Sequence, residues 1–353
     1  ACTVVKSNGV APHAEIITDP DTWRAMDAGK MSGIEAFAAK RLKIRGSIEK
    51  SLQFETLFER PDAGAVTHSI RDLRIPGASI SALIAGPEGA PPVVLLHGLG
   101  ATKASWLTVV PALASHHRVV AIDLPGFGAS SKPLGSYKPK WLAHHVVGLL
   151  DALGFERALL AGNSMGGRVS MEVAMSHPDR VDGIACLCPA AAFTYRPALL
   201  LAKILRPELG MLAGRLPRRR VKEGLKQLFA DASSVDDSWY DAAIDDFLDV
   251  WKSPRARIAF ARSLRHIYLD EPEGETGFWN RLTRMETPAL FIYGRRDVLI
   301  THQFSSKVRT TIPHAEVKVW KDCGHVPQIE FPDRTARTML DFYARTTGAK
   351  AAS

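Results

Sequence analysis

The stretch Gly162-Asn163-Ser164-Met165-Gly166-Gly167 decides the fold that we predict for this chain. It follows the apolar run 158–161, which is typical of a buried strand, and precedes a helical pattern of apolar residues over 169–175. A strand that turns into a helix within about two residues strains the turning residue, and flanking glycines let the backbone segments approach closely. Ser164 therefore lies at the tip of the turn, above a helix N-terminus that favours a developing anion. We interpret Ser164 as a candidate nucleophile, with Gly162 and Gly166 as the glycines of the elbow.

A nucleophilic serine needs a base and an acid that orients the base, and one candidate for each follows a predicted strand. Asp297 comes after the apolar run 289–292, and His325 comes after the alternating run 317–320. Taken singly, Asp297 could be a turn residue or a helix N-cap, and His325 could be a surface histidine. Their shared position after consecutive strands favours the catalytic interpretation.

The order Ser164, Asp297, His325 resembles that of the α/β-hydrolase fold family. Two further stretches are similar to motifs of that family: 93–100, which contains His97-Gly98-Leu99-Gly100, and the loop 123–130. The resemblance covers about residues 65–347. It implies a doubly wound, mostly parallel sheet with a helical cap insertion, preceded here by a small α+β segment.

The resemblance also implies roles for residues around the serine. The backbone N–H groups of Leu99 and Met165 would form the oxyanion hole, and His97 and Gly98 would shape its loop. His325 would take the Ser164 proton during attack on an acyl carbon, while Asp297 holds the imidazole. This chemistry requires no metal and no cofactor.

About a hundred residues separate the strand that ends near Pro189 from the one that begins at Ala289, although a crossover between parallel strands needs only about a dozen. We expect the excess, about residues 190–285, to form a helical cap over Ser164. Its many large apolar residues, Phe247 and Trp251 among them, predict a lipophilic small-molecule substrate.

Nine of the chain's basic residues lie between Phe193 and Ala230, against two acidic ones, interleaved with leucines over 199–212. Such a helix could contact an anionic membrane surface, or it could be the charged outer face of the cap, because seven aspartates follow in 231–249. The segment lacks aromatic interleaving and any recognisable nucleic-acid module, so we predict no nucleic-acid partner.

Residues 1–60 resemble part of the sterol carrier protein 2 lipid-binding domain, on the apolar spacing of Ile34-Glu35-Ala36-Phe37 and 41–47 and on two glycine turns. The opening helix and first strands of that domain have no counterpart here. The alternative is an amphipathic N-terminal arm, and the segment could either carry lipid or pack on the hydrolase as a remnant. The Pro- and Gly-containing stretch 60–67 is the predicted linker.

Composition sets broad limits. The 353 residues carry a net charge of +8, and 46% of them are hydrophobic, which suits one large domain with an appendage. No apolar run approaches the ~18 residues of a membrane span. The four cysteines, Cys2, Cys186, Cys188 and Cys323, show no metal-ligand spacing. We expect reduced thiols in a cytoplasmic protein that is either free or membrane-associated; the oligomeric state is not determined by the sequence.

Three function classes compete. The first is hydrolysis of carboxylic esters of medium or long acyl chains through an acyl-enzyme. The second is cleavage of a carbon–carbon bond, because 162–167 is also similar to the elbow of the meta-cleavage product hydrolases, although His97-Gly98-Leu99-Gly100 lacks the continuation common there. The third is a non-catalytic lipid-binding protein on a hydrolase scaffold.

Overall fold

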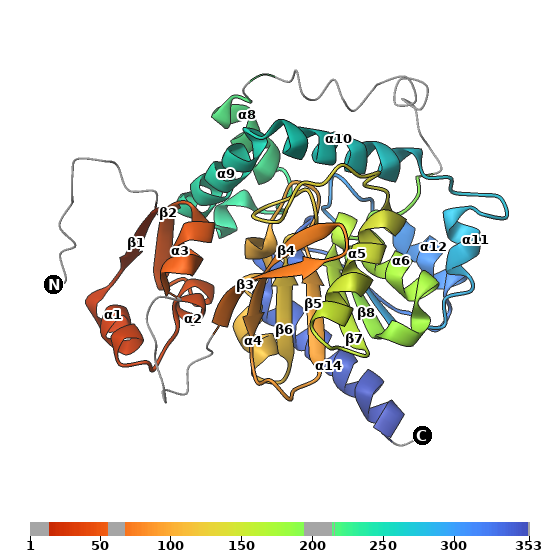
Figure 1. The fold of residues 1–353 in the computed structure, drawn as a ribbon, viewed down its shortest axis with the longest axis horizontal. Coiled ribbons are helices and arrows are strands. Elements are labelled where there is room, and N and C mark those ends of the chain that lie inside the picture. The colour runs from red at the N-terminus through yellow and green to blue at the C-terminus, as the bar shows by residue number, and fades with distance from the viewer. Residues whose placement is uncertain (1–13, 56–67, 194–213, 215, 352–353) are drawn as a thin grey trace.

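The computed structural model describes residues 14–55, 68–193, 214 and 216–351 (Figure 1). The predicted linker at 60–67, the leucine-rich run 199–212 and Cys2 lie outside these residues.

An eight-stranded sheet forms the centre of the molecule (Figure 1). Its strands are β3 (His68–Ile75), β4 (Ala78–Ala85), β5 (Pro92–Leu96), β6 (Arg118–Ile122), β7 (Ala158–Asn163), β8 (Val181–Leu187), β9 (Ala289–Gly294) and β10 (Glu316–Trp320). They lie in the order β10-β9-β8-β7-β5-β6-β4-β3. Strands β5 to β10 run parallel to one another, and β4 runs antiparallel to both of its neighbours, β6 and β3. The sheet reverses its winding direction at β5, which lies between β6 and β7, and ligands of open α/β sheets bind at the carboxyl ends of strands at such a point.

The central strands are apolar on both faces because helices cover both faces. In β5, Val94 and Leu96 belong to one core cluster, while Val93 and Leu95 belong to the other. The helices around the sheet are α4 (Val110–Ala114), α5 (Pro139–Ala152), α6 (Met165–Ser176), α12 (Phe304–Thr311), α13 (Pro327–Glu330) and α14 (Pro332–Ala351), with the short turns η1 (Lys103–Trp106) and η2 (Pro178–Arg180). The α5, α6 and α12 helices contribute to the first core, and α4 and α14 to the second. The predicted doubly wound, mostly parallel sheet is confirmed.

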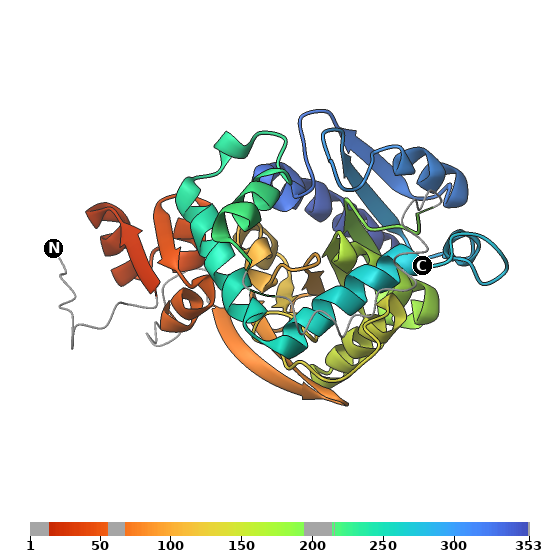
Figure 2. The ribbon, with the colours of Figure 1, turned by 90° about the horizontal axis from the view of Figure 1, so that it is seen from above.

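A helical insertion between β8 and β9 lies across the carboxyl ends of the strands (Figures 1 and 2). Its described elements are α8 (Arg218–Lys226), η4 (Ala232–Ser234), α9 (Asp237–Trp251), α10 (Pro254–Leu269) and α11 (Phe278–Leu282). We call this insertion the cap. Two of its helices, α9 and α10, begin at side-chain caps: the Asp236 carboxylate accepts from the N–H of Ser238, and the Ser253 hydroxyl accepts from that of Ala256.

Three basic residues of α8 pair with acidic residues of α9. Arg218 bonds to Asp241 and Asp245, and Lys222 and Lys226 lie 3.1 Å and 3.0 Å from carboxylate oxygens of Asp241 and Asp237. The charges of Arg218, Lys222 and Lys226 are therefore compensated along these two helices, and Arg219 pairs with Glu223 within α8. Within the described part of the chain, the helices do not combine the length and the hydropathy that a membrane crossing needs.

The N-terminal segment forms a small α+β unit: β1 (Ala14–Thr18), α1 (Pro20–Asp27), α2 (Gly33–Ala38), β2 (Leu42–Gly46) and α3 (Ile48–Glu55), with β1 antiparallel to β2. A reciprocal pair of hydrogen bonds between Ser32 and Glu35 starts α2. The apolar residues of this segment share one core cluster with the second face of the sheet. The division into 1–60 and 65–347 remains a prediction, because the described parts of both pack together.

Candidate active site

Ser164 occupies a strained turn between β7 and α6. Its φ and ψ are 53° and −114°, a combination that residues with a side chain rarely adopt. Such strain costs of the order of 1–3 kcal/mol and persists only where the surroundings impose it. Here β8 and the loop after it hold the turn, since Ser164 donates its N–H to Leu187 O at 2.9 Å and its carbonyl accepts from Ala190 N at 2.9 Å.

Glycine is required on both sides of this serine. A Cβ on Gly162 would lie 2.2 Å from the carbonyl carbon and oxygen of Gly166, and a Cβ on Gly166 would lie 2.0 Å from Leu96 O. Both distances are far inside van der Waals contact, so the strand, the helix and β5 can approach this closely only without these side chains. The elbow glycines therefore have the steric role that their spacing predicts.

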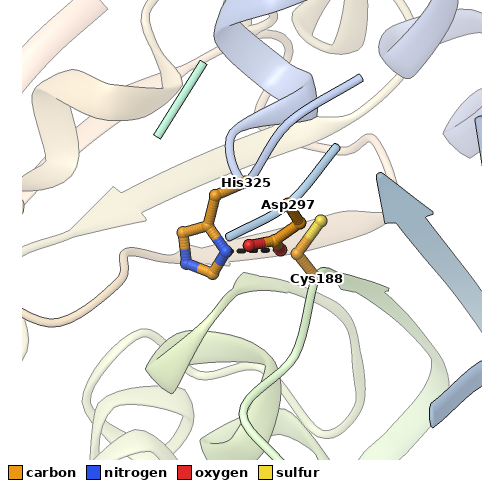
Figure 3. Close-up of side chains that lie close together, drawn as sticks. All are labelled: Cys188, Asp297 and His325. Atoms are coloured by element: carbon orange, nitrogen blue, oxygen red, sulfur yellow. Dashed lines mark hydrogen bonds and ion pairs between the residues drawn. The ribbon is translucent and has the colours of Figure 1, made fainter. Parts of the chain in front are cut away.

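Asp297 and His325 are hydrogen-bonded to each other beyond the ends of β9 and β10. The Nδ1 of His325 lies 2.7 Å from Oδ2 of Asp297, and both side chains are buried (Figure 3). The other carboxylate oxygen accepts the backbone N–H groups of Leu299 and Ile300 at 2.8 Å and 2.9 Å. The carboxylate is thus fixed by three donors, and the bond to Nδ1 leaves Nε2 of the imidazole as the atom available to take a proton.

Asn163 joins the serine turn to the histidine loop. Its side-chain amide donates to the carbonyl of His325 at 2.9 Å and to that of Leu187 at 3.0 Å. Among these described residues there is no hydrogen bond between the Ser164 hydroxyl and the His325 imidazole. Catalytic hydrogen bonds often form only when substrate is bound, so the juxtaposition is compatible with a nucleophile and its base. The sequence analysis assigned no role to Asn163, because an amide between two motif residues carries no signal of its own.

The turn after β5, which contains Leu99, lies against the serine elbow. A Cβ on Gly98 would lie 3.2 Å from the Cβ of Ser164. Met165 is the first residue of α6, so its backbone N–H has no acceptor in the preceding turn of the helix. The N–H groups predicted for the oxyanion hole therefore come from two neighbouring turns.

His97 is fully buried and fixes the shape of this turn. Its Nε2 accepts the N–H of Leu124 at 3.0 Å, so its Nδ1 carries the proton and donates to Gly98 O at 2.7 Å. Burial lowers the pKa of His97, which keeps the ring neutral. His97 thus holds the turn of residues 97–100, which we call the oxyanion turn after the role that the sequence predicts for it.

Two acidic residues near the site bond to groups other than the histidine. Glu330 accepts the backbone N–H of Gly324 through Oε2 and that of Ala230, in the cap, through Oε1, both at 2.6 Å. Asp270 pairs with the buried Arg168. His325 also donates its backbone N–H to Leu228 O in the cap at 2.6 Å, so two hydrogen-bonded contacts, this one and that of Glu330, connect the cap to the histidine loop.

Cys188 lies on the side of Asp297 opposite His325 (Figure 3). One ligand atom from each of these three residues falls within 4.8 Å of the others, the one such group with metal-binding potential among the described residues. Metal ligation requires a thiolate, whereas burial and the Asp297 charge raise the pKa of the Cys188 thiol well above its usual range. The Nδ1 and Oδ2 atoms are also bonded to each other, so the arrangement suits an acid–base pair better than a metal centre.

A small apolar cavity borders the oxyanion turn under the cap. Its volume is about 20 Å³, room for roughly one water. It is lined by Gly100, Ala101, Thr102, Gly126, Phe127, Gly128, Phe247, Val250, Trp251, Ala256 and Phe260. The rings of Phe247, Trp251 and Phe260 pack on one another, with centroids 5.4–6.3 Å apart.

Comparison with known proteins agrees with this architecture. Residues 91–332 match the alpha/beta hydrolase fold family, and residues 1–59 match the SCP-2 sterol transfer family. The acetyltransferase component of an acetoin cleaving system from Pseudomonas putida is 33% identical over 73% of this chain, which spans 64% of that protein. A 2-hydroxy-6-oxononadienedioate/2-hydroxy-6-oxononatrienedioate hydrolase from Dechloromonas aromatica (strain RCB) is 31% identical over 72% of this chain and 87% of its own length.

Among solved structures, a bacterial membrane phospholipase A superposes with a TM-score of 0.67 at 27% identity, covering 79% of this chain and 87% of the other. The family match over residues 91–332 contains the elbow and the Asp297–His325 pair. This chain belongs to the α/β hydrolase fold family.

Proposed function

We propose that this hydrolase cleaves carboxylic esters with a lipophilic acyl chain through an acyl-enzyme on Ser164. The observation that carries the proposal is the 2.7 Å bond between His325 and Asp297, next to a strained serine turn. This arrangement orients a buried imidazole through Nδ1, so that Nε2 can serve as the base for the proposed nucleophile. It is the minimum that a hydroxyl needs in order to become a nucleophile near neutral pH.

In the proposed mechanism, Nε2 of His325 accepts the hydroxyl proton as Ser164 Oγ attacks the ester carbonyl carbon. The negative charge on the carbonyl oxygen is stabilised by the N–H groups of Leu99 and Met165. The imidazolium, stabilised by Asp297, then protonates the departing alcohol as the carbon–oxygen bond breaks. Water attacks the acyl-enzyme in the same way, and the acid leaves with Ser164 restored.

The lipophilic character of the substrate is inferred from the cavity under the cap. Its lining residues carry no charge among the described positions, and three aromatic rings dominate one wall. Each buried methylene contributes about 0.8 kcal/mol to binding. The similarity to a membrane phospholipase A and the match to a sterol transfer family both support an apolar acyl group. Because three basic residues of α8 are paired with α9, the described part of the cap gives membrane contact less support than a charged outer face.

Carbon–carbon bond hydrolysis is the second candidate, favoured by the identity with the Dechloromonas hydrolase. That protein is named for a dioate, a substrate with two carboxylates. Among the described residues, the cavity lining offers such a substrate no cation to bind, and this is why we place ester hydrolysis first.

Specificity constants for nitrophenyl esters from C2 to C12, measured beside one ring-fission diketone, test the proposal. We expect the constants to rise with chain length to a medium or long optimum and the diketone to be a poor substrate. A peak at C2 that falls with length contradicts the lipophilic substrate, and faster turnover of the diketone than of every ester favours the second candidate.

A further inference from the structure

The N-terminal segment, defined here as residues 14–55, is packed against the cap and against the sheet. Its buried side chains Ile34, Leu42, Ile44, Ile48 and Leu52 belong to the same core cluster as β5 and as Ala242 of α9. The β2 strand and the α3 helix pack on α9, and the views of Figures 1 and 2 agree on this arrangement. The described part of this segment is therefore joined to the active-site cap as well as to the sheet.

A carboxylate of the cap holds the beginning of α3. Asp246, in α9, accepts a hydrogen bond from the Ser47 hydroxyl at 2.9 Å and also bonds to the backbone N–H groups of Ile48 and Glu49. A carboxylate at a helix N-terminus satisfies donors that lack partners within the helix. Burial, assisted by the charge of Glu49, nevertheless raises the pKa of Asp246 to about 7.

Glu49, the second residue of α3, contacts a buried residue of the hydrolase domain. The carboxylate of Glu49 lies 2.5 Å from the ammonium of Lys103, which is completely buried in η1 and also lies 2.8 Å from Asp123. Asp123 accepts the backbone N–H of Lys103 at 2.7 Å as well. Removing one partner from such a buried network leaves a charge without compensation, which is costly.

The network ends at the oxyanion turn. Leu124, next to Asp123, donates its N–H to His97, and His97 in turn donates to Gly98 O. On the cap side, the residue after Asp246 is Phe247, whose ring lies over Gly100: a Cβ on Gly100 would be 3.3 Å from it. The two walls of the apolar cavity, α9 and the oxyanion turn, are therefore both tied to α3.

We propose that the N-terminal segment sets the position of α9 over the oxyanion turn, with Glu49 and Asp246 as positioning residues, and thereby takes part in selecting the acyl chain of the ester. The proposal rests on the ester hydrolysis proposed above. A cavity of about 20 Å³ admits a medium acyl chain only if Phe247, Trp251 or Phe260 moves. The contacts of α3 with Asp246 and of Glu49 with Lys103 limit how far α9 can move.

The test uses the full chain with Glu49→Gln, Asp246→Asn and the double substitution. Lys43→Gln is the matched control, because Lys43 also joins the N-terminal segment to the cap, 2.8 Å from Asp236, but both side chains are about half exposed. Hydrogen exchange without substrate reports the protection of α9 and of residues 97–106. The ratio of the C8 to the C2 ester specificity constants reports selection.

We expect the double variant to lose protection in α9 and to change the C8 to C2 ratio by roughly two- to thirtyfold, the range of coupling carried through packed contacts. The control should change neither quantity. If the double variant is not folded, the single variants test the proposal, and we expect smaller changes in the same direction in both protection and the C8 to C2 ratio. Unchanged protection, or lost protection with an unchanged ratio, overturns the proposal.

Failure of the proposed ester hydrolysis can be distinguished from failure of the positioning proposal. A parent protein that hydrolyses no ester contradicts the proposed function, and the chain-length part of the inference then fails with it. Hydrogen exchange still decides, without any substrate, whether Glu49 and Asp246 position α9.

Discussion

Two regions of the molecule are held together in different ways: the serine site, formed by Ser164, Asp297 and His325, and the cap junction, where the N-terminal segment 14–55 meets the cap and η1. At the serine site, the turns are fixed mostly by backbone hydrogen bonds and by glycines that permit close approach, as at Ser164 and Gly166. At the cap junction, charged side chains from distant parts of the sequence meet, as Glu49 does with Lys103. Backbone contacts leave little freedom for variation, whereas side-chain networks can change without altering the fold. This contrast suggests that chemistry resides in the first region and selectivity in the second.

The largest effect is expected from removing the proposed nucleophile. Ser164→Ala should lower esterase activity on the order of 10⁶-fold, because the members of such a triad act as a unit. Steady-state rates with a nitrophenyl ester measure this, and an unchanged melting temperature serves as the control. Activity within tenfold of the parent would exclude Ser164 from the mechanism.

Removing the charge of the acid should have the next largest effect. Asp297→Asn keeps the shape of the side chain but favours the wrong tautomer of His325, and we expect a loss of about 10⁴-fold in kcat. Asp270→Asn is the matched control, since Asp270 pairs with Arg168 away from the histidine. Equal losses in the two variants would show that the assignment of the acid is wrong.

Glu330 lies where the two regions meet, and its substitution sharpens the comparison. Burial raises the pKa of Glu330, yet its carboxylate binds the N–H groups of Gly324 and Ala230. Glu330→Gln should lower the free energy of unfolding by about 2 kcal/mol, through loss of one charge-assisted acceptor. It should lower kcat less than about a hundredfold, because His325 is displaced but not removed. Denaturant unfolding and kinetics measure both; a kcat loss as large as that of Asp297→Asn would make Glu330 part of the chemistry.

The smallest effect is a pH dependence at the cap junction. The pKa of Asp246 is about 7 in the folded protein against 3.8 for an unperturbed aspartate. Between these values the folded state binds the extra proton, so this group lowers the free energy of unfolding as pH rises from about 4 to about 7 and adds no slope above that range. Asp246→Asn should remove this part of the slope. Unfolding titrations of parent and variant measure the difference, and parallel pH curves would contradict the assignment.

Much of the serine site could be predicted from the sequence because its signals are local. A strand followed by Gly-x-Ser-x-Gly predicts both the turn at Ser164 and its glycines, and the runs before Asp297 and His325 coincide with β9 and β10. The carboxyl ends of parallel strands meet at one edge, so these side chains were expected to be near one another. The sequence could not predict Asn163 or Glu330 in their roles, because these depend on loop backbones that only tertiary packing brings together.

The cap junction was largely inaccessible to sequence reasoning. Lys103 lies in a stretch without a motif, the loop that begins at Asp123 showed only a family resemblance, and Glu49 lies 54 residues before Lys103. The apolar pattern of the N-terminal segment predicted a core but did not distinguish a lipid carrier from a unit that packs on the hydrolase. For the ion pairs between α8 and α9, the sequence indicated only that a basic stretch is followed by an acidic one.

The most direct test of the central claim is covalent labelling of the folded chain with a fluorophosphonate, in which the serine oxygen displaces fluoride. Peptide mapping by mass spectrometry locates the adduct. We predict one adduct, on the peptide that contains Ser164, absent in Ser164→Ala and formed much more slowly in His325→Ala. An adduct on another residue, or ester hydrolysis that persists after Ser164 is blocked, would contradict a Ser164 acyl-enzyme.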